Sequence, residues 1–318
     1  MMDATERSAA LKRWAYDLGF MFCGISKARR LDEEAEHLEQ WIKQGFQGNM
    51  QYLEKNADVR LDPRLLVPGA QSVISLAFNY FPSRTQNPDA PKIARYAYGR
   101  DYHKVLKKKL NTLFKTMQQE FGTIQGRVFV DSAPLLERKW AELSGLGWIG
   151  KNGLLLNRQA GSYFFLAEIV TDLALAADGP IKDYCGTCTA CIDACPTQAI
   201  LDHKTLDASR CISYLTIELK DAIPSGFRGS MDHWMFGCDI CQEVCPWNRF
   251  SKPHQEPDFE PKDALMEMSS VAWEELTESV FNSLFEGSAV KRTGYEGLRR
   301  NIKFLKQDEQ GPIETHES

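Results

Sequence analysis

The chain of 318 residues lacks the patterns of an exported or membrane-spanning protein. Its N-terminus, MMDATERSAALKRW, carries acids and no apolar core, unlike a signal peptide. Arg29 and Arg30 lead into LDEEAEH rather than an apolar run, which argues against twin-arginine export. The most apolar stretch, 163–177, is interrupted by Glu168 and Asp172 and is too short to span a bilayer. We therefore expect a soluble, cytoplasmic protein.

Excess positive charge and nucleotide-binding loops are also missing. With 38 Lys+Arg against 43 Asp+Glu, the net charge is −5, so any nucleic-acid contact needs a local basic patch. Neither GxGxxG nor GxxxxGK[ST] occurs, which leaves a Rossmann or P-loop site unsupported. No solenoid repeat or low-complexity tract is present. A hydrophobic content of 43% is ordinary for a globular protein, and the length allows one large and one smaller domain.

Hydrophobic periodicity predicts three parts. Residues 1–177 alternate helices and strands, as in an α/β or α+β domain, and the run Ser72–Tyr80 is typical of a strand buried on both faces. Residues 178–250 are dominated by cysteine, and 251–318 read as a polar linker and a short helical tail with a frayed end. Within the first part, the expected helices are 11–18, 31–42, 106–121 and 135–143. Gly19 and Gly45 follow the first two helices. The other expected strands are 127–130, 153–157 and 162–171.

Nine cysteines in a protein that is expected to be cytoplasmic indicate metal or redox chemistry rather than disulfides. Cys185-x2-Cys188-x2-Cys191-x3-Cys195-Pro has the spacing of bacterial ferredoxins, in which three cysteines hold one cluster and the fourth reaches another. Two-residue gaps wrap the backbone around one cluster, and the turn before proline directs Cys195 away. The sequence therefore predicts a ferredoxin-like unit.

A second run, Cys238-x2-Cys241-x3-Cys245-Pro, lacks one ligand, which Cys211 supplies. Two 4Fe–4S clusters then use eight cysteines: Cys185, Cys188, Cys191 and Cys245 for the first, and Cys195, Cys211, Cys238 and Cys241 for the second. Two four-cysteine zinc sites are the alternative, although the Cys-Pro endings have no role in them. The ninth, Cys23, lies among apolar residues and is interpreted as a small buried hydrophobe.

Three segments, VDSAPLLERKWAELSGLGWIGKNGLLL (130–156), CGTCTACIDACPTQAI and FGCDICQEVCPWN, closely resemble the epoxyqueuosine reductases, and the similarity extends over about residues 10–305. This resemblance implies a cobalamin-dependent enzyme with two iron–sulfur clusters. Such an enzyme reduces the epoxide of epoxyqueuosine at the tRNA wobble position, the last step of queuosine synthesis. The family is related to reductive dehalogenases, and its cobalamin domain resembles flavin nitroreductases.

The resemblance also implies roles for individual residues. Asp131 matches the proton donor and needs an environment that raises its pKa, although its sequence position equally suits a helix N-cap or strand-end turn. DYHKVL (101–106) departs from the DxHxxG motif, so base-off cobalamin without a protein histidine on cobalt is implied. The implied cobalamin contacts are Asp131, Gly150, Asn152, Leu155, Ser213, Cys238 and Asp239, together with Arg60 and Arg95, which equally suit salt bridges.

For tRNA, the resemblance implies a contact at Lys220. A stripe of Lys291, Arg292, Arg299, Arg300, Lys303 and Lys306 is interpreted either as a phosphate-binding surface or as a solvated helix face. Trp234 and Trp247 either stack on a base or pack over a cluster. Many family members continue with a helical-repeat domain that helps to grip tRNA, and this sequence ends just after the segment that opens it. The remaining expectations are a monomer and a low-potential electron donor.

Two other interpretations remain open at this point. One is a dehalogenase-like, cobalamin-dependent reductase of a small molecule, which the missing export signal disfavours. The other is a ferredoxin-type electron carrier, which would need neither the α/β domain nor Asp131.

Overall fold

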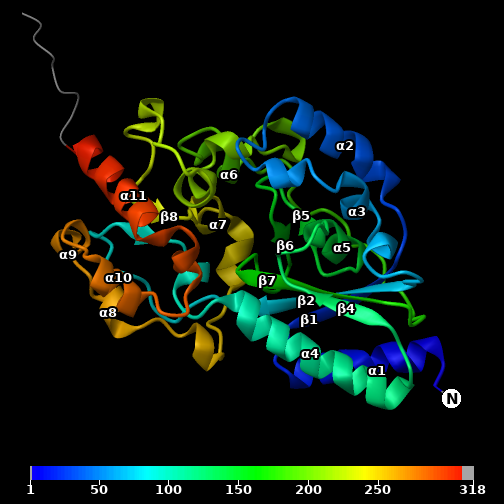
Figure 1. The fold of residues 1–318 in the computed structure, drawn as a ribbon. Coiled ribbons are helices and arrows are strands. Elements are labelled where there is room, and N and C mark those ends of the chain that lie inside the picture. Colours follow the sequence, from blue (N-terminus) through cyan, green and yellow to red (C-terminus); the bar gives the residue numbers. More distant parts are fainter. Residues whose placement is uncertain (1, 310–318) are drawn as a thin grey trace, which may run out of the picture.

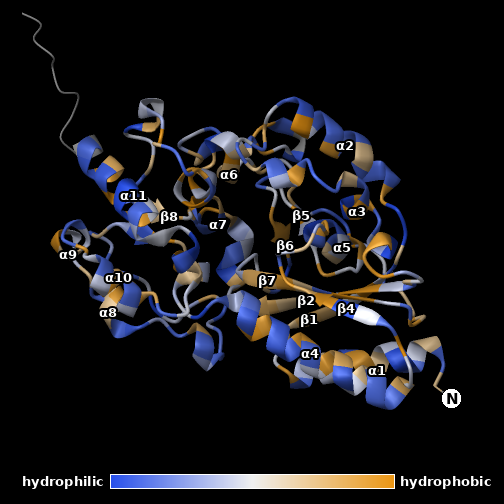
Figure 2. Cartoon of the chain, viewed as in Figure 1, coloured by the Kyte–Doolittle hydropathy of each residue, from blue (hydrophilic) through white to orange (hydrophobic). Residues whose placement is uncertain are grey.

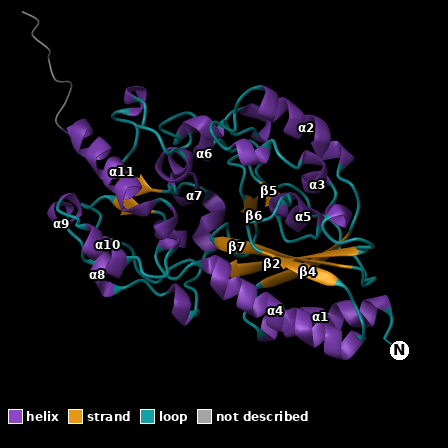
Figure 3. Ribbon diagram, in the orientation of Figure 1, coloured by secondary structure: helices purple, strands orange, loops and turns teal. Residues whose placement is uncertain are grey.

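A computed structural model describes residues 2–309, so the predicted frayed end at 310–318 lies outside the described residues. Its centre is a four-stranded sheet in the order β1-β2-β7-β4 (Figures 1 and 3). These strands are β1 (Phe22–Lys27), β2 (Ser72–Asn79), β7 (Phe164–Thr171) and β4 (Gly126–Phe129). All three pairings are antiparallel, so this part of the chain has α+β rather than α/β architecture.

Helices cover both faces of this sheet, which explains the apolar run in β2. On one face α1 (Ala4–Asp17) and α4 (Tyr102–Phe121) pack their apolar residues, Leu11 and Leu106 among them, against Ile74 and Leu76 (Figure 1). On the other face lie α2 (Asp32–Lys43), α3 (Ala57–Leu61) and α5 (Glu137–Leu143), and Trp140 packs near Val73. Figure 2 shows the sheet as the hydrophobic centre between these layers. All four predicted helices are confirmed, and Gly19 and Gly45 have the positive φ of a helix end.

The prediction of two paired strands at 153–157 and 162–171 is only partly right. β7 forms as expected, but β6 (Leu155–Leu156) is short and pairs with β5 (Trp148–Ile149). β7 has β2 on one side and β4 on the other, so it has no free edge for β6. In the described residues, one isolated β-bridge, between Asn157 and Gly161, joins the two predicted strands.

A second hydrophobic core lies beside the first domain and joins segments far apart in sequence. It includes the parallel pair β3 (Lys92–Ile93) and β8 (Trp234–Phe236), the fully buried Trp273 and Phe285, and Val290. The helices from 251 onward pack on this core (Figure 1), and they are α8 (Asp263–Met266), α9 (Ser270–Glu274), α10 (Glu278–Leu284) and α11 (Gly294–Glu309). The domain boundaries given above stay predictions.

Two short helices, α6 (Ala190–Asp193) and α7 (Ile240–Glu243), pack together between the two cores and carry cysteines. Cys23 lies apart from them, buried in β1 within the first core, as predicted. None of the helices in the described part of the chain is long and apolar enough to span a bilayer.

Candidate redox active site

Four cysteines line one cavity of about 230 Å³ at the surface between α6 and α7, together with Trp247 and Lys151. They are the four predicted for the first cluster: Cys185, Cys188, Cys191 and Cys245. Burial, with smaller contributions from the neighbouring thiols Cys245 and Cys185, raises the pKa of Cys191 to about 11. Cys188 is exposed, so this quartet opens to solvent.

The other four predicted ligands form a deeper group. Burial raises the pKa values of Cys238 and Cys241 well above the usual range, and the charge of Cys211 adds to both shifts. Cys195 is a further neighbour of Cys211 and Cys241. The main-chain N–H of Ala199 also donates to Cys195 Sγ at 3.3 Å.

The donor chemistry of these two groups suits iron–sulfur clusters. Eight thiols lie in two sets of four, and neighbouring thiols contribute to the raised pKa values of Cys191 and Cys245 in the first set and of Cys211, Cys238 and Cys241 in the second. Bound iron would stabilise the thiolates that burial disfavours, with release of protons.

Asp131 follows β4 in the left-handed region, with φ of 56°. Its Oδ2 accepts a 2.7 Å hydrogen bond from the Tyr102 hydroxyl and lies 3.2 Å from His103 Nε2. The other imidazole nitrogen, Nδ1, lies 2.7 Å from Asp101 Oδ1. The interpretation of Asp131 as a helix cap is wrong, because Leu136 occupies the N-cap of α5 and Asp131 binds side chains of α4 instead.

The electrostatics of Asp131 differ from the expectation that its pKa is raised. Burial raises that pKa, but the hydrogen bonds from His103 and Tyr102 outweigh it, so the pKa lies below the usual value. Burial alone would lower the pKa of His103, yet its bonds to Asp101 and Asp131 raise it to about 9. At neutral pH the proton of this pair therefore resides on His103. Neither Tyr102 nor His103 was expected from the sequence to belong to the site.

A partly buried tyrosine, Tyr96, connects Asp131 to the cysteine region. Its ring centroid lies 6.2 Å from that of Tyr102, which donates to Asp131, and the residue before it, Arg95, donates its main-chain N–H to Asp239. Asp239 immediately follows Cys238 in the deeper quartet. Arg292 also acts on Asp131, while its guanidinium pairs with Glu218 at 2.7 Å.

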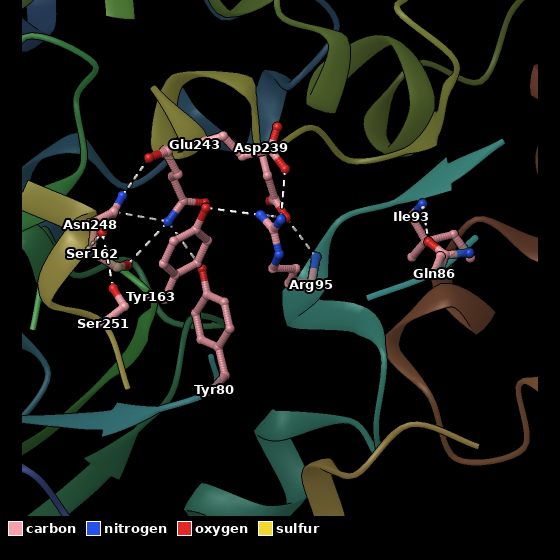
Figure 4. A network of polar contacts seen from close by, with 11 residues as sticks. Tyr80, Gln86, Ile93, Arg95, Ser162, Tyr163, Asp239, Glu243, Asn248 and Ser251 are labelled. Carbon is pink, nitrogen blue, oxygen red and sulfur yellow. Dashed lines mark hydrogen bonds and ion pairs between the residues drawn. The ribbon is translucent and has the colours of Figure 1, made fainter. Parts of the chain in front are cut away.

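Arg95 and Asp239 form one polar network (Figure 4). Asp239 Oδ2 accepts the Arg95 main-chain N–H at 2.8 Å, and the Arg95 guanidinium pairs with Glu243 at 2.8 Å and donates to the Tyr163 hydroxyl at 2.9 Å. The salt-bridge interpretation of Arg95 is therefore correct for this structure. Arg60 is also buried, where it donates to the Tyr52 carbonyl at 2.9 Å.

Of the predicted loop residues, Asn152 lies beside the cysteines. Asn152 is buried and its Nδ2 donates to the Cys241 carbonyl at 3.3 Å. Gly150 approaches Leu156 so closely that a Cβ would stand 2.6 Å from its Cδ1. Leu155 is buried in β6, and Ser213 lies at the start of the 214–218 helix.

The predicted basic stripe is divided in the structure. Arg300 turns inward and donates to the carbonyls of Leu215, Leu219 and Asp221. Its charge is therefore used within the protein, so Arg300 is a poor phosphate ligand. Lys220 is exposed and donates to the Ile217 carbonyl at 3.0 Å. Of the tryptophans, Trp247 contacts Trp148 and Tyr184, and Trp234 is buried in the second core.

An α+β domain joined to two cysteine quartets defines an iron–sulfur protein. The family model "4Fe-4S double cluster binding domain" matches residues 184–248, and "Epoxyqueuosine reductase QueG, DUF1730" matches residues 60–132. An epoxyqueuosine reductase of Leadbetterella byssophila is 55% identical over 302 residues, which are 95% of this chain and 99% of that protein. The chain belongs to the epoxyqueuosine reductase family and is an oxidoreductase.

Solved structures of this family have the same fold. An epoxyqueuosine reductase with a tRNA-Tyr epoxyqueuosine-modified stem loop superposes with a TM-score of 0.84 at 32% identity, covering 93% of this chain and 80% of that one. The Bacillus subtilis enzyme, with its catalytic aspartate loop swung out of the active site, gives 0.84 at 31% identity with the same coverage.

Proposed function

We propose that this protein reduces the epoxide of epoxyqueuosine at the wobble position of tRNA, the last step of queuosine synthesis. The observation that carries the proposal is the Asp131–His103 pair, which Tyr102 and Tyr96 connect to Asp239, the residue after Cys238 of the deeper cysteine quartet. Membership of the family and a relative solved with a modified tRNA stem loop support the substrate. An enzyme acting on tRNA works in the cytoplasm, and we expect a monomer.

The two quartets are proposed to hold two 4Fe–4S clusters, with the ligands predicted from the spacing. The match to a double-cluster model favours iron–sulfur clusters over zinc. Electrons would enter through the quartet containing the exposed Cys188, and the deeper quartet, which includes Cys238 next to Asp239, would pass them on toward the site.

Base-off cobalamin is proposed as the second cofactor, on the resemblance of the 130–156 segment to the family. It would supply a low-valent cobalt that receives electrons singly and acts as the reductant. Gly150, Asn152, Leu155, Ser213, Cys238 and Asp239 are the proposed contacts, together with Asp131. Arg60 and Arg95, the other two proposed contacts, are already bonded within the protein, Arg60 to the Tyr52 carbonyl and Arg95 to Glu243.

The Asp131–His103 pair is proposed as the proton source. Conversion of an epoxide to an alkene takes two electrons and two protons and releases the oxygen as water. Asp131 is the group with an exposed carboxylate, since 48% of its side chain is accessible, while His103 behind it holds the proton at neutral pH. The proton held on His103 passes to Asp131 and from Asp131 to the departing oxygen, and the second proton reaches the pair from solvent.

For tRNA, Lys220 and the outward residues of α11 are the proposed contacts. Arg299, which lies 5.9 Å from the Tyr295 ring, is a better candidate than Arg300.

Anaerobic purification with analysis of iron, sulfide, cobalt and zinc tests the cofactors. We expect about eight irons per chain and uptake of cobalamin, and zinc in place of iron would refute the proposal. Conversion of epoxyqueuosine in an anticodon stem-loop, with dithionite as reductant, tests the reaction against reduction of a small halogenated compound. Asp131→Ala should abolish conversion and keep iron and cobalamin, whereas the surface variant Asp58→Ala should convert normally.

A further inference from the structure

Two glutamates that the reaction does not use stand behind Asp131. The main-chain N–H of Asp131 donates to Glu137 Oε1 at 2.6 Å. Glu137 is the first residue of α5, six positions further along the chain. A non-glycine residue with φ of 56° keeps that conformation only where its surroundings hold it. The bond from Glu137 is therefore a restraint on the Asp131 loop, defined as residues 130–136.

Glu168 in the central sheet is a neighbour of Glu137. Glu168 lies within β7, paired with Ser75 of β2 and Phe129 of β4, and its exposed fraction is 0%. Neither carboxylate oxygen of Glu168 receives a hydrogen bond from a donor in the described structure. A buried carboxyl without a donor is stable only as the neutral acid, which can donate its own proton. Glu137 is the acceptor beside it.

We propose that Glu137 is a positioning residue: anchored by the neutral acid Glu168, it holds the Asp131 loop in its productive conformation through the main-chain N–H of Asp131. The inference rests on the proposed function only in taking this loop conformation as the one that reacts. The restraint itself is independent of cofactor and substrate. It gives a reason for an acidic residue in the middle of a buried strand.

Glu137 titrates near neutrality, in support of this role. Burial, with a smaller contribution from the charge of Asp131, raises the pKa of Glu137 to about 7. Glu168 acts on Glu137 from β7 and His103 acts on it from α4, and the charge of Glu137 in turn acts on Arg138 and Tyr102. A carboxylate accepts hydrogen bonds more strongly than a carboxylic acid. The loop should therefore be held more tightly above about pH 7 than below it.

Hydrogen exchange of the peptide covering 130–136 tests the restraint in the purified protein without substrate. Glu137→Ala should raise the amide hydrogen-exchange rate of this peptide, taken relative to the intrinsic rate of the unfolded sequence, by about 10- to 100-fold. This is the change expected for loss of a hydrogen bond to a charged group. Glu137→Gln keeps an acceptor oxygen but no charge, so its exchange should be close to that of the wild type at pH 6 and faster than that of the wild type at pH 8. It should also lose the difference between pH 6 and pH 8 that the wild type shows. Glu34→Ala, which removes a partner of Lys139 on the same helix, is the matched control.

The outcomes separate this inference from the proposed function. Unchanged exchange in a folded Glu137→Ala protein overturns the positioning role. If that variant does not fold, Glu137→Asp decides, because its shorter side chain keeps the charge but cannot reach the Asp131 N–H. Faster exchange supports the role, and unchanged exchange refutes it. If exchange responds as expected but even the wild type fails to convert epoxyqueuosine, the proposed function fails and the restraint stands.

Discussion

Replacement of His103 by glutamine should change how the stability of the protein depends on pH. His103 lies between Asp101 and Asp131, at 2.7 and 3.2 Å, and these contacts raise its pKa from 6.5 to about 9. A raised pKa means that the folded state binds the proton more tightly than the unfolded state. The protonated imidazole therefore stabilises the fold fully below about pH 6.5, and the contribution is lost as the pH rises through about 9.

The magnitude follows from the same shift. A difference of about 2.5 pKa units corresponds to about 3.4 kcal/mol, and partial exposure of the imidazole reduces this to about 1–2 kcal/mol through solvent screening. The lowered pKa values of Asp101 and Asp131 arise from the same interactions with His103. They are therefore not added to this stability contribution, because that would count each interaction twice.

Thermal unfolding of wild type and His103→Gln at pH 6 and pH 10, in matched scans, measures this contribution. With about 2 °C per kcal/mol for a protein of this size, the wild type should lead the variant by about 2–4 °C at pH 6 and lose that lead by pH 10. An NMR titration of the imidazole gives the pKa directly. Equal pH dependence of the two proteins, or an imidazole pKa near 6.5, would refute the assignment of the proton to His103.

Three further changes have defined outcomes. Asn248→Ala removes side-chain bonds to the Ser162 N–H and the Gln242 carbonyl, each 2.7 Å, and should lower stability by about 2–3 kcal/mol in thermal unfolding. Gly147→Ala would place a Cβ 2.1 Å from the Leu156 carbonyl oxygen and should lower the soluble yield, whereas Gly226→Ala, with open space around it, should not. Cys211→Ser should lose about half of the iron, because it belongs to one of two clusters, while Cys23→Ser keeps the full complement.

Local sequence patterns predicted the helices and strands well. Which strands and side chains pair in space depends on residues far apart in the chain. The run 72–80 indicated a strand buried on both faces, but its antiparallel neighbours come from β1 and β7, far away in sequence. The cysteine spacing indicated two quartets because ligands of one cluster lie mostly within a few residues. The partnership of His103 with Asp131 joins residues 28 positions apart and left no local pattern. Glu168 did leave one, since it interrupts an apolar run.

Asp131 stands between two groups of opposite electrostatic effect. Tyr102 and His103 on α4 stabilise its carboxylate, and Glu137 with Glu168 behind the loop disfavours a further negative charge there. A proton donor needs both influences, because it must release a proton to the substrate and then take one back. His103 supplies the proton that Asp131 takes back, and the two glutamates favour the protonated form of Asp131.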